Sequence, residues 1–136
     1  VQKFISLFSN NKRPHKNDRI VYCFGKFDLL HPGHISFLKK AKELGDFLIV
    51  GICKDDSRTV MNLNERVLNV LSMKYVDDVI IGAPDVLTAD LISILIIKNN
   101  DDNSFLIIFF FTKRVKKVII LRKIESTICL QRVIFF

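Results

Sequence analysis

Continuous apolar runs alternate with amphipathic segments through the first two thirds of the chain. "RIVYCF" (residues 19–24) and "DFLIVGIC" (residues 46–53) are rich in β-branched and aromatic residues, which is typical of strands buried on both faces. Between them, residues 33–44 repeat apolar residues every three or four positions, which predicts a helix that ends at Gly45. This order of strand, loop, helix and strand predicts a parallel α/β sheet with right-handed crossovers.

A second unit of the same kind follows. Asn62, with Glu65 three positions later, has the pattern of a helix start in which the two side chains cap each other's backbone. The expected apolar face of this helix consists of Leu63, Val67, Val70 and Leu71. A third strand is expected around residues 79–81, and Thr88 is placed to cap a third helix.

The two ends of the chain differ from this α/β pattern. Residues 1–18 end in the polar, turn-rich stretch "SNNKRPHKND" and are predicted to be a linker. The α/β domain is predicted to span residues 19–97. Residues 98–136 are an atypical tail in which residues 105–111 and 115–121 resemble strands, without a regular period. We hypothesise that this tail is not native to the domain and comes from an incomplete or misread gene model.

Composition narrows the possible classes of protein. Nearly half of the 136 residues are apolar, which is enough for a substantial core. Most of the formal net charge of +7 falls in the tail, so we expect a solvated basic segment rather than a nucleic-acid partner. The three cysteines form no CxxC pair, which argues against a disulfide framework or a zinc site and favours reduced, intracellular thiols.

No membrane segment or leader is expected from the sequence. The longest uninterrupted apolar run, residues 105–111, is much shorter than the ~20 residues that a membrane-spanning helix requires. The N-terminal residues show no signal-peptide pattern.

The stretch "CFGKFDLLHPGH", residues 23–34, carries the candidate chemistry. Gly25 directly follows a buried strand, where the chain must turn and a ligand can approach the backbone closely. Pro32 suits the first turn of the next helix, whose N-terminus attracts phosphate. His31 and His34 can then donate hydrogen bonds to the same anion. Such donors suit nucleotidyl transfer, in which charge develops on phosphate oxygens and no covalent nucleophile of the protein is needed. A metal-binding pair is the alternative, but no third ligand cluster accompanies it, so no metal site is predicted.

These residues resemble a known superfamily. "GKFDLLHPGH" is similar to the signature of the HxGH nucleotidyltransferases, and "AKELGDFLIVGICKDD" with "NERVLNVLSMKYVDDVIIGAP" resembles the cytidylyltransferases that build lipid precursors. More narrowly, residues 61–93 resemble the second, C-terminal repeat of the cytidylyltransferases that act on phosphoethanolamine. The resemblance implies a Rossmann-like parallel sheet and a reaction of CTP, supplied with Mg²⁺, with phosphoethanolamine. The products would be CDP-ethanolamine and pyrophosphate, in phosphatidylethanolamine synthesis.

The resemblance also implies roles for single residues. His31 and His34 would be the catalytic residues, and Asp28 is expected to order the loop rather than to bind metal. The implied nucleotide-binding residues are Gly25, Lys26, Phe27, His31, His34 and Arg66. Arg66 would offer its guanidinium to the triphosphate, and the role of Asp55 stays open. The resemblance further implies pairing with a second cytidylyltransferase repeat or a homodimer. The implied location is the cytoplasm, peripherally at the endoplasmic reticulum membrane.

Three departures from the resemblance leave alternatives open. Position 26 is normally small, whereas this chain has a lysine there. The lysine-bearing loop before the second helix is shortened to "SRTV", and Arg58, the nearby cation, is not expected to replace the lysine. The fourth strand and the motifs after it are not found, so the sheet is expected to be incomplete at its C-terminal side. The alternatives are a choline- or glycerol-phosphate cytidylyltransferase, or a catalytically inactive nucleotide-binding module.

Overall fold

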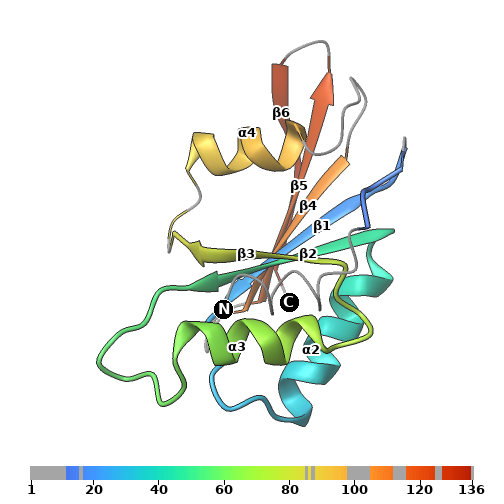
Figure 1. The fold of residues 1–136 in the computed structure, drawn as a ribbon. Helices are drawn as coiled ribbons and strands as arrows, with labels where there is room; N and C mark the ends of the chain where they lie inside the picture. The colour runs from blue at the N-terminus through green and yellow to red at the C-terminus, as the bar shows by residue number, and fades with distance from the viewer. Residues whose placement is uncertain are drawn as a thin grey trace.

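In the part of the chain that the structure describes, six strands form one sheet and three helices pack around its parallel part (Figure 1). The computed structural model describes residues 12–15, 17–84, 86, 88–97, 105–111, 116–124 and 127–135. The elements, in chain order, are β1 (Ile20–Gly25), α2 (Pro32–Glu43), β2 (Phe47–Cys53), α3 (Leu63–Leu71), β3 (Asp78–Ala83), α4 (Ala89–Ile97), β4 (Phe105–Phe111), β5 (Lys116–Ile124) and β6 (Thr127–Phe135). The strands and helices expected within residues 19–97 are confirmed, with small shifts at their ends.

The order of strands in the sheet is β3-β2-β1-β4-β5-β6. β1 pairs in parallel with both β2 and β4, β2 pairs in parallel with β3, and β5 and β6 add as antiparallel strands. The predicted Rossmann-like α/β fold with a parallel sheet is thereby confirmed. Successive parallel strands are added on one side of β1 and then on the other, and in such sheets the carboxyl ends of the strands form the ligand crevice.

The expectation that the fourth parallel strand is missing was wrong. β4 runs beside β1, with Ile108 opposite Tyr22. Ile107 and Ile108 are buried on opposite faces of the sheet. A strand buried on both faces is a continuous apolar run, so "FLIIFFF" lacks the alternation that marks a half-exposed strand. The predicted domain boundary at residue 97 stays a prediction.

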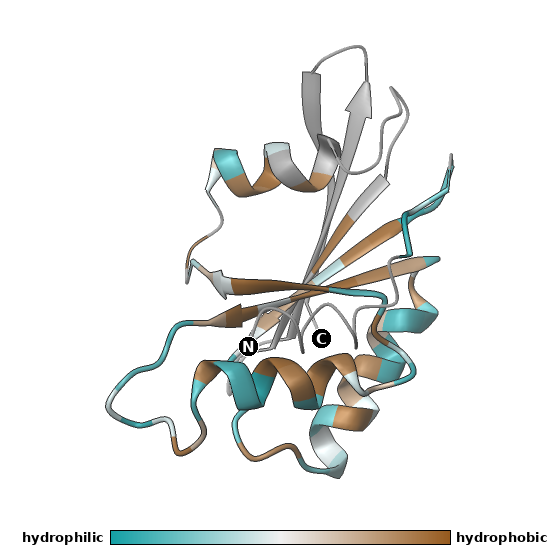
Figure 2. Cartoon of the chain, viewed as in Figure 1, coloured by the Kyte–Doolittle hydropathy of each residue, from teal (hydrophilic) through white to brown (hydrophobic). Residues whose placement is uncertain are grey.

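The helices cover both faces of the sheet, and each face has its own apolar core (Figures 1 and 2). Val21 and Cys23 of β1 belong to the core under α2 and α3, whereas Ile20 and Tyr22 belong to the core under α4. The brown, apolar side of α3 faces the sheet in Figure 2. The period of two along β1 thus assigns neighbouring residues to opposite layers.

Two residues of the helices depart from the expected pattern. Ile35, on the expected apolar face of α2, is 38% exposed because it lies in the first turn, beyond the part of α2 that packs on the sheet. Arg66 is fully buried on the inner face of α3, beside the expected Val67 and Val70. In the described part of the chain, no helix is both long enough and apolar enough to cross a bilayer.

Candidate active site

Two histidines build the start of α2. His31 is the N-cap residue, and its Nδ1 accepts the backbone N–H of Gly33 at 3.0 Å. In the reciprocal bond, Nδ1 of His34 accepts the backbone N–H of His31 at 3.4 Å. The sequence has histidines at the two positions where capping residues usually satisfy the free N–H groups of a helix start. The two side chains predicted to be catalytic therefore also hold the first turn of α2.

These bonds define how each imidazole can act on a ligand. An Nδ1 atom that accepts a hydrogen bond carries no proton, so the proton of the neutral ring is on Nε2, which is then a donor. Burial, reinforced by the nearby His31 ring, lowers the pKa of His34 and favours its neutral form. The ring of His31 is exposed and that of His34 is half-buried. The start of α2 thus combines imidazole donors with the positive end of the helix dipole, which suits a phosphate.

The loop between β1 and α2 is held in an unusual backbone conformation. Phe27 and Leu29 have φ values of 50° and 46°, in the left-handed region that non-glycine residues seldom adopt. The buried ring of Phe27 packs against His34, with centroids 5.5 Å apart. Asp28 lies between Phe27 and Leu29. Its carboxylate accepts the backbone N–H groups of Val60 and Met61 at 2.8 and 3.0 Å. These two bonds lower the pKa of Asp28 and fasten the loop to the segment before α3.

Arg66 forms hydrogen bonds to three segments at the carboxyl ends of the strands. Its guanidinium donates to the carbonyl oxygens of Lys26, Cys53 and Met61 at 2.7, 3.0 and 3.2 Å. A fourth bond, 2.5 Å long, joins it to the carboxylate of Asp55. The side chain has no exposed surface. In this structure Arg66 therefore positions the ends of β1 and β2, and the contact with a triphosphate implied by the resemblance stays a prediction.

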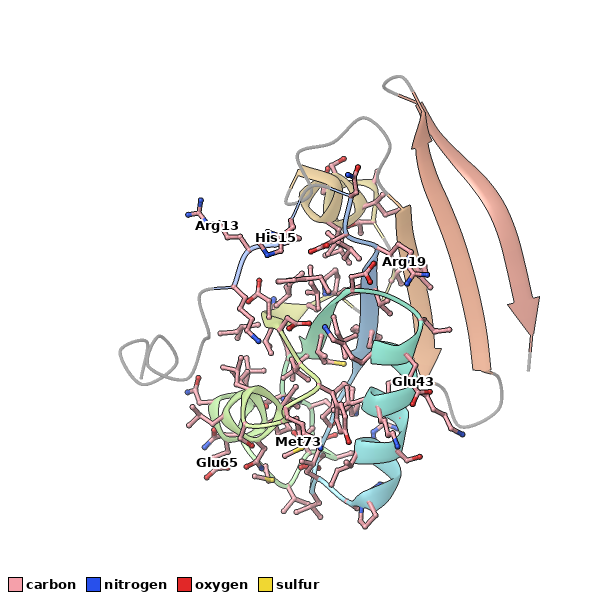
Figure 3. The ribbon with its side chains drawn as sticks, turned by 90° about the vertical axis from the view of Figure 1, so that its right-hand side faces the viewer. Arg13, His15, Arg19, Glu43, Glu65 and Met73 are labelled. Carbon is pink, nitrogen blue, oxygen red and sulfur yellow. The ribbon has the colours of Figure 1, made fainter. Side chains whose placement is uncertain are left out.

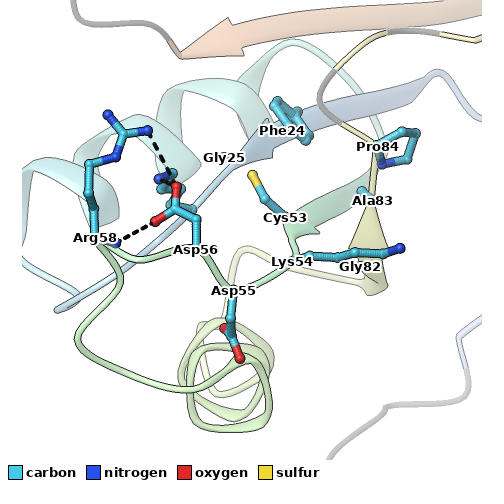
Figure 4. A pocket seen from close by; sticks show the side chains of 11 residues that line it. Phe24, Gly25, Cys53, Lys54, Asp55, Asp56, Arg58, Gly82, Ala83 and Pro84 are labelled. Atoms are coloured by element: carbon cyan, nitrogen blue, oxygen red, sulfur yellow. Dashed lines mark hydrogen bonds and ion pairs between the residues drawn. The ribbon is translucent and has the colours of Figure 1, made fainter.

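A pocket of about 500 Å³ lies at the carboxyl ends of β1, β2 and β3 (Figure 4). It is lined by Phe24, Gly25, Lys26, Cys53, Lys54, Asp55, Asp56, Arg58, Gly82, Ala83 and Pro84. Within it, the Lys26 ammonium forms an ion pair with the carboxylate of Asp56. That ion pair, with the backbone N–H of Arg58, lowers the pKa of Asp56 to about 2. The pocket is therefore strongly charged on one side, and Phe24 and Pro84 provide an apolar wall.

The predicted site residues lie in three places. Phe27, His31 and His34 meet at the start of α2, Gly25 and Lys26 line the pocket, and Arg66 is buried in α3 without lining the pocket. The sequence interpretation missed Lys54 and Asp56 as pocket residues. Their position directly after β2, next to β1 in the sheet, was the signal that could have identified them.

No resident metal centre is evident at this edge. Among the residues that the structure describes, no three His, Cys, Asp or Glu side chains are grouped so as to hold a metal ion. The carboxylates of Asp28, Asp55 and Asp56 are each already bonded to N–H groups or to a cation of the protein.

Comparison with known proteins identifies the family. The sequence model of the family described as "Cytidylyltransferase-like" matches residues 22–128. Ethanolamine-phosphate cytidylyltransferase of Arabidopsis thaliana is 50% identical over 94 residues, which cover 63% of this chain and 22% of the relative. The enzyme of the same name from Dictyostelium discoideum is 49% identical over 96 residues, 65% of this chain and 27% of the relative. FAD synthase of Pyrococcus abyssi is 47% identical over 85 residues, 57% of each chain.

The resemblance to phosphoethanolamine cytidylyltransferases is confirmed by these relatives. The chain spans about a quarter of the length of the two cytidylyltransferases. The family match includes most of β1, the paired histidines, Arg66 and β4. Because this match covers most of the sequence, the chain belongs to the cytidylyltransferase-like family of nucleotidyltransferases.

Proposed function

We propose that this chain carries the active site of a CTP:phosphoethanolamine cytidylyltransferase. It transfers CMP from CTP to phosphoethanolamine and releases CDP-ethanolamine and pyrophosphate, a step of phosphatidylethanolamine synthesis. The observation that carries the proposal is the reciprocal capping of α2 by His31 and His34, which orients two imidazole donors at a helix N-terminus. The identity of about half the aligned residues with ethanolamine-phosphate cytidylyltransferases supports the choice of substrates.

The reaction needs donors rather than a nucleophile of the protein. An oxygen of the phosphoethanolamine phosphate attacks the α-phosphorus of CTP, and the bond from that phosphorus to the pyrophosphate oxygen breaks. Negative charge increases on the leaving pyrophosphate and shifts among the oxygens of the α-phosphate. The Nε2–H groups of His31 and His34 donate to these oxygens, and the N-terminus of α2 adds its dipole. Since the capping bonds orient both rings before substrate binds, little reorganisation is needed during the reaction.

Mg²⁺ is proposed to arrive with CTP as part of the substrate. The engaged carboxylates of Asp28, Asp55 and Asp56 do not fit a metal cage built by the protein. Mg²⁺ commonly keeps several waters and binds through substrate phosphates, where it neutralises part of their charge.

The working assembly is proposed to contain a second cytidylyltransferase repeat or a second copy of this chain. The greater length of the cytidylyltransferase relatives supports this proposal. The proposed location is the cytoplasm, with peripheral association at the endoplasmic reticulum membrane, where the lipid product of the pathway is needed.

The test is formation of CDP-ethanolamine by this chain from CTP, Mg²⁺ and phosphoethanolamine. Choline phosphate and glycerol phosphate are offered in parallel. Because one relative is an FAD synthase, a separate reaction with FMN and ATP measures the formation of FAD and pyrophosphate. The proposal expects phosphoethanolamine to be the best acceptor. Faster transfer to another acceptor, or FAD formation alone, would overturn the choice of substrate. Nucleotide binding without turnover in any assay would favour an inactive module.

A further inference from the structure

The ion pair between Lys26 and Asp56 joins two loops across the pocket. Lys26 follows β1 and Asp56 follows β2, so the pair links the carboxyl ends of neighbouring parallel strands. Both side chains are partly exposed, at 39% and 35%. In Figure 4, Asp56 lies between Arg58 and the end of β1. A ligand entering the pocket therefore meets this ion pair at a position where its charges remain accessible to water.

The remaining charges of the pocket are unequally compensated. The Asp55 carboxylate is bonded to Arg66 and to the backbone N–H of Leu63. The Asp56 carboxylate accepts from the Lys26 ammonium. It also accepts from the backbone N–H of Arg58 at 2.8 Å and from the Arg58 guanidinium at 3.4 Å. For Lys54, whose stem passes close to Gly82, no carboxylate partner occurs in the described part of the chain. Among the described residues, the pocket therefore offers Lys54 without a carboxylate partner, and Asp56 paired with both Lys26 and Arg58.

We propose that a zwitterionic phosphomonoester inserts into the Lys26–Asp56 ion pair. The phosphate replaces Asp56 as the partner of Lys26 and is also bound by Lys54, while the ammonium group of the ligand replaces Lys26 as the partner of Asp56. This inference rests on the proposed function and deepens it, because it assigns the residues that recognise phosphoethanolamine.

Charge balance favours a zwitterion over other phosphomonoesters. An ammonioalkyl phosphate replaces one ion pair with two, so neither Lys26 nor Asp56 loses its counter-charge. A purely anionic ligand such as glycerol 3-phosphate can take Lys26 but leaves Asp56 with Arg58 as its nearest cation. A trimethylammonium group has no N–H to donate to the Asp56 carboxylate. The ion pair thus selects for a ligand that presents an anion and an N–H cation together.

The paired groups also suit release of the product. In the free protein Lys26 and Asp56 satisfy each other, so neither charge is left unpaired after a ligand departs. The exchange takes place on exposed side chains, for which the net value of an ion pair is small. Breaking the resting pair therefore costs the incoming ligand little.

The test is the binding preference of the Asp56→Asn variant. The asparagine side chain can still accept the backbone N–H of Arg58 through its amide oxygen, so the turn at this position is retained. Calorimetry with the full chain and an α,β-methylene analogue of CTP measures the affinities for phosphoethanolamine and for glycerol 3-phosphate. We expect Asp56→Asn to lower the affinity for phosphoethanolamine about fivefold and to leave the affinity for glycerol 3-phosphate unchanged or higher. Lys26→Ala should weaken both ligands.

The matched control is Asp46→Asn. Asp46 is also an exposed aspartate in an ion pair, with Arg19 at 3.1 Å. It directly precedes β2, whereas Asp56 follows the other end of this strand. The Asp46→Asn variant should leave the affinities for phosphoethanolamine and glycerol 3-phosphate unchanged. The inference is overturned if Asp56→Asn retains the preference for phosphoethanolamine, or if the wild-type chain binds neither ligand. Selective binding without CDP-ethanolamine formation would instead refute the proposed reaction and support the inference about recognition.

Discussion

The rings of His31 and His34 lie with their centroids 3.9 Å apart, and the backbone N–H of His31 donates to Nδ1 of His34. The two side chains therefore serve the helix start and the proposed site at once. Variants of these residues have to separate the two roles, because loss of a capping residue alone destabilises a helix.

Replacing His31 by asparagine should separate folding from turnover. Asparagine is a good N-cap residue, so His31→Asn should keep the stability of α2, whereas His31→Ala should lose about 1 kcal/mol. Both variants lack the Nε2–H donor, and we expect CDP-ethanolamine formation to fall by about a hundredfold or more in each. Urea unfolding and turnover are measured on the same preparations. Turnover within a few fold of wild type in both variants would refute the assignment of His31.

Stability should decrease on mild acidification because of His34. Burial and the adjacent His31 ring lower the pKa of His34 below its ordinary value of 6.5. The unfolded chain therefore takes up a proton more readily than the folded chain as the pH falls through 6.5. The contribution of neutral His34 to stability is present above this pH and is lost below it, when a protonated Nδ1 can no longer accept from His31. The urea concentration at the midpoint of unfolding should decrease as the pH is lowered from 8 to 5.5.

The matched variant for this pH effect is His34→Gln. Glutamine has no proton to gain in this range but can still reach back to the N–H group of the N-cap residue. A pH dependence equally steep in His34→Gln and in the wild type would assign the effect to other groups.

Arg66 should be among the most sensitive positions of the chain. Arg66→Met leaves the carbonyl oxygens of Lys26, Cys53 and Met61 without their donor, so we expect a loss of about 3 kcal/mol in the free energy of unfolding. The control is Arg13→Met, since Arg13 extends into solvent (Figure 3). Urea denaturation compares the two. A similar, small effect in both variants would contradict the positioning role of Arg66.

Removing the hydroxyl group of Tyr22 should stabilise the protein. Tyr22 is 1% exposed, and its hydroxyl has no hydrogen-bond partner in the described part of the structure. It lies over Gly51, where a Cβ atom would collide with the hydroxyl oxygen. Tyr22→Phe keeps the ring and removes an unsatisfied polar atom, so we expect a gain of about 1 kcal/mol. Thermal unfolding measures this gain in stability, and Tyr75→Phe, at a partly exposed tyrosine, is the comparison. A lower stability of Tyr22→Phe than of the wild type would disprove this account.

The sequence predicts the part of the fold that follows from local periodicity. β1, α2 and β2 have clear apolar patterns, and the Asn62–Glu65 cap predicted for α3 is present in the structure. β4 was not expected in the sheet, because an apolar run followed by a basic segment has no period that distinguishes it from other structures.

The candidate site was predictable only where its residues are neighbours in sequence. His31 and His34 occupy one helical turn, so their spacing reveals them. The Lys26–Asp56 pair joins residues 30 positions apart, and sheet order brings them together. The burial of Arg66 likewise depends on the carbonyl oxygens of Lys26 and Cys53, which lie at the ends of β1 and β2. The apolar pattern of α3 alone contains no information about the position of these oxygens.

The bonds that Asp28 makes to Val60 and Met61, and those that Arg66 makes to the ends of β1 and β2, have a thermodynamic consequence. The segment between β2 and α3 is already ordered before any ligand arrives, so binding does not have to freeze it. If this segment were unstructured in the free protein, ligand binding would have to order it at a cost in conformational entropy. The ordering would bury extra surface and give a large negative heat-capacity change. We therefore expect a small heat-capacity change on ligand binding, set by the surface of the ligand and its pocket alone.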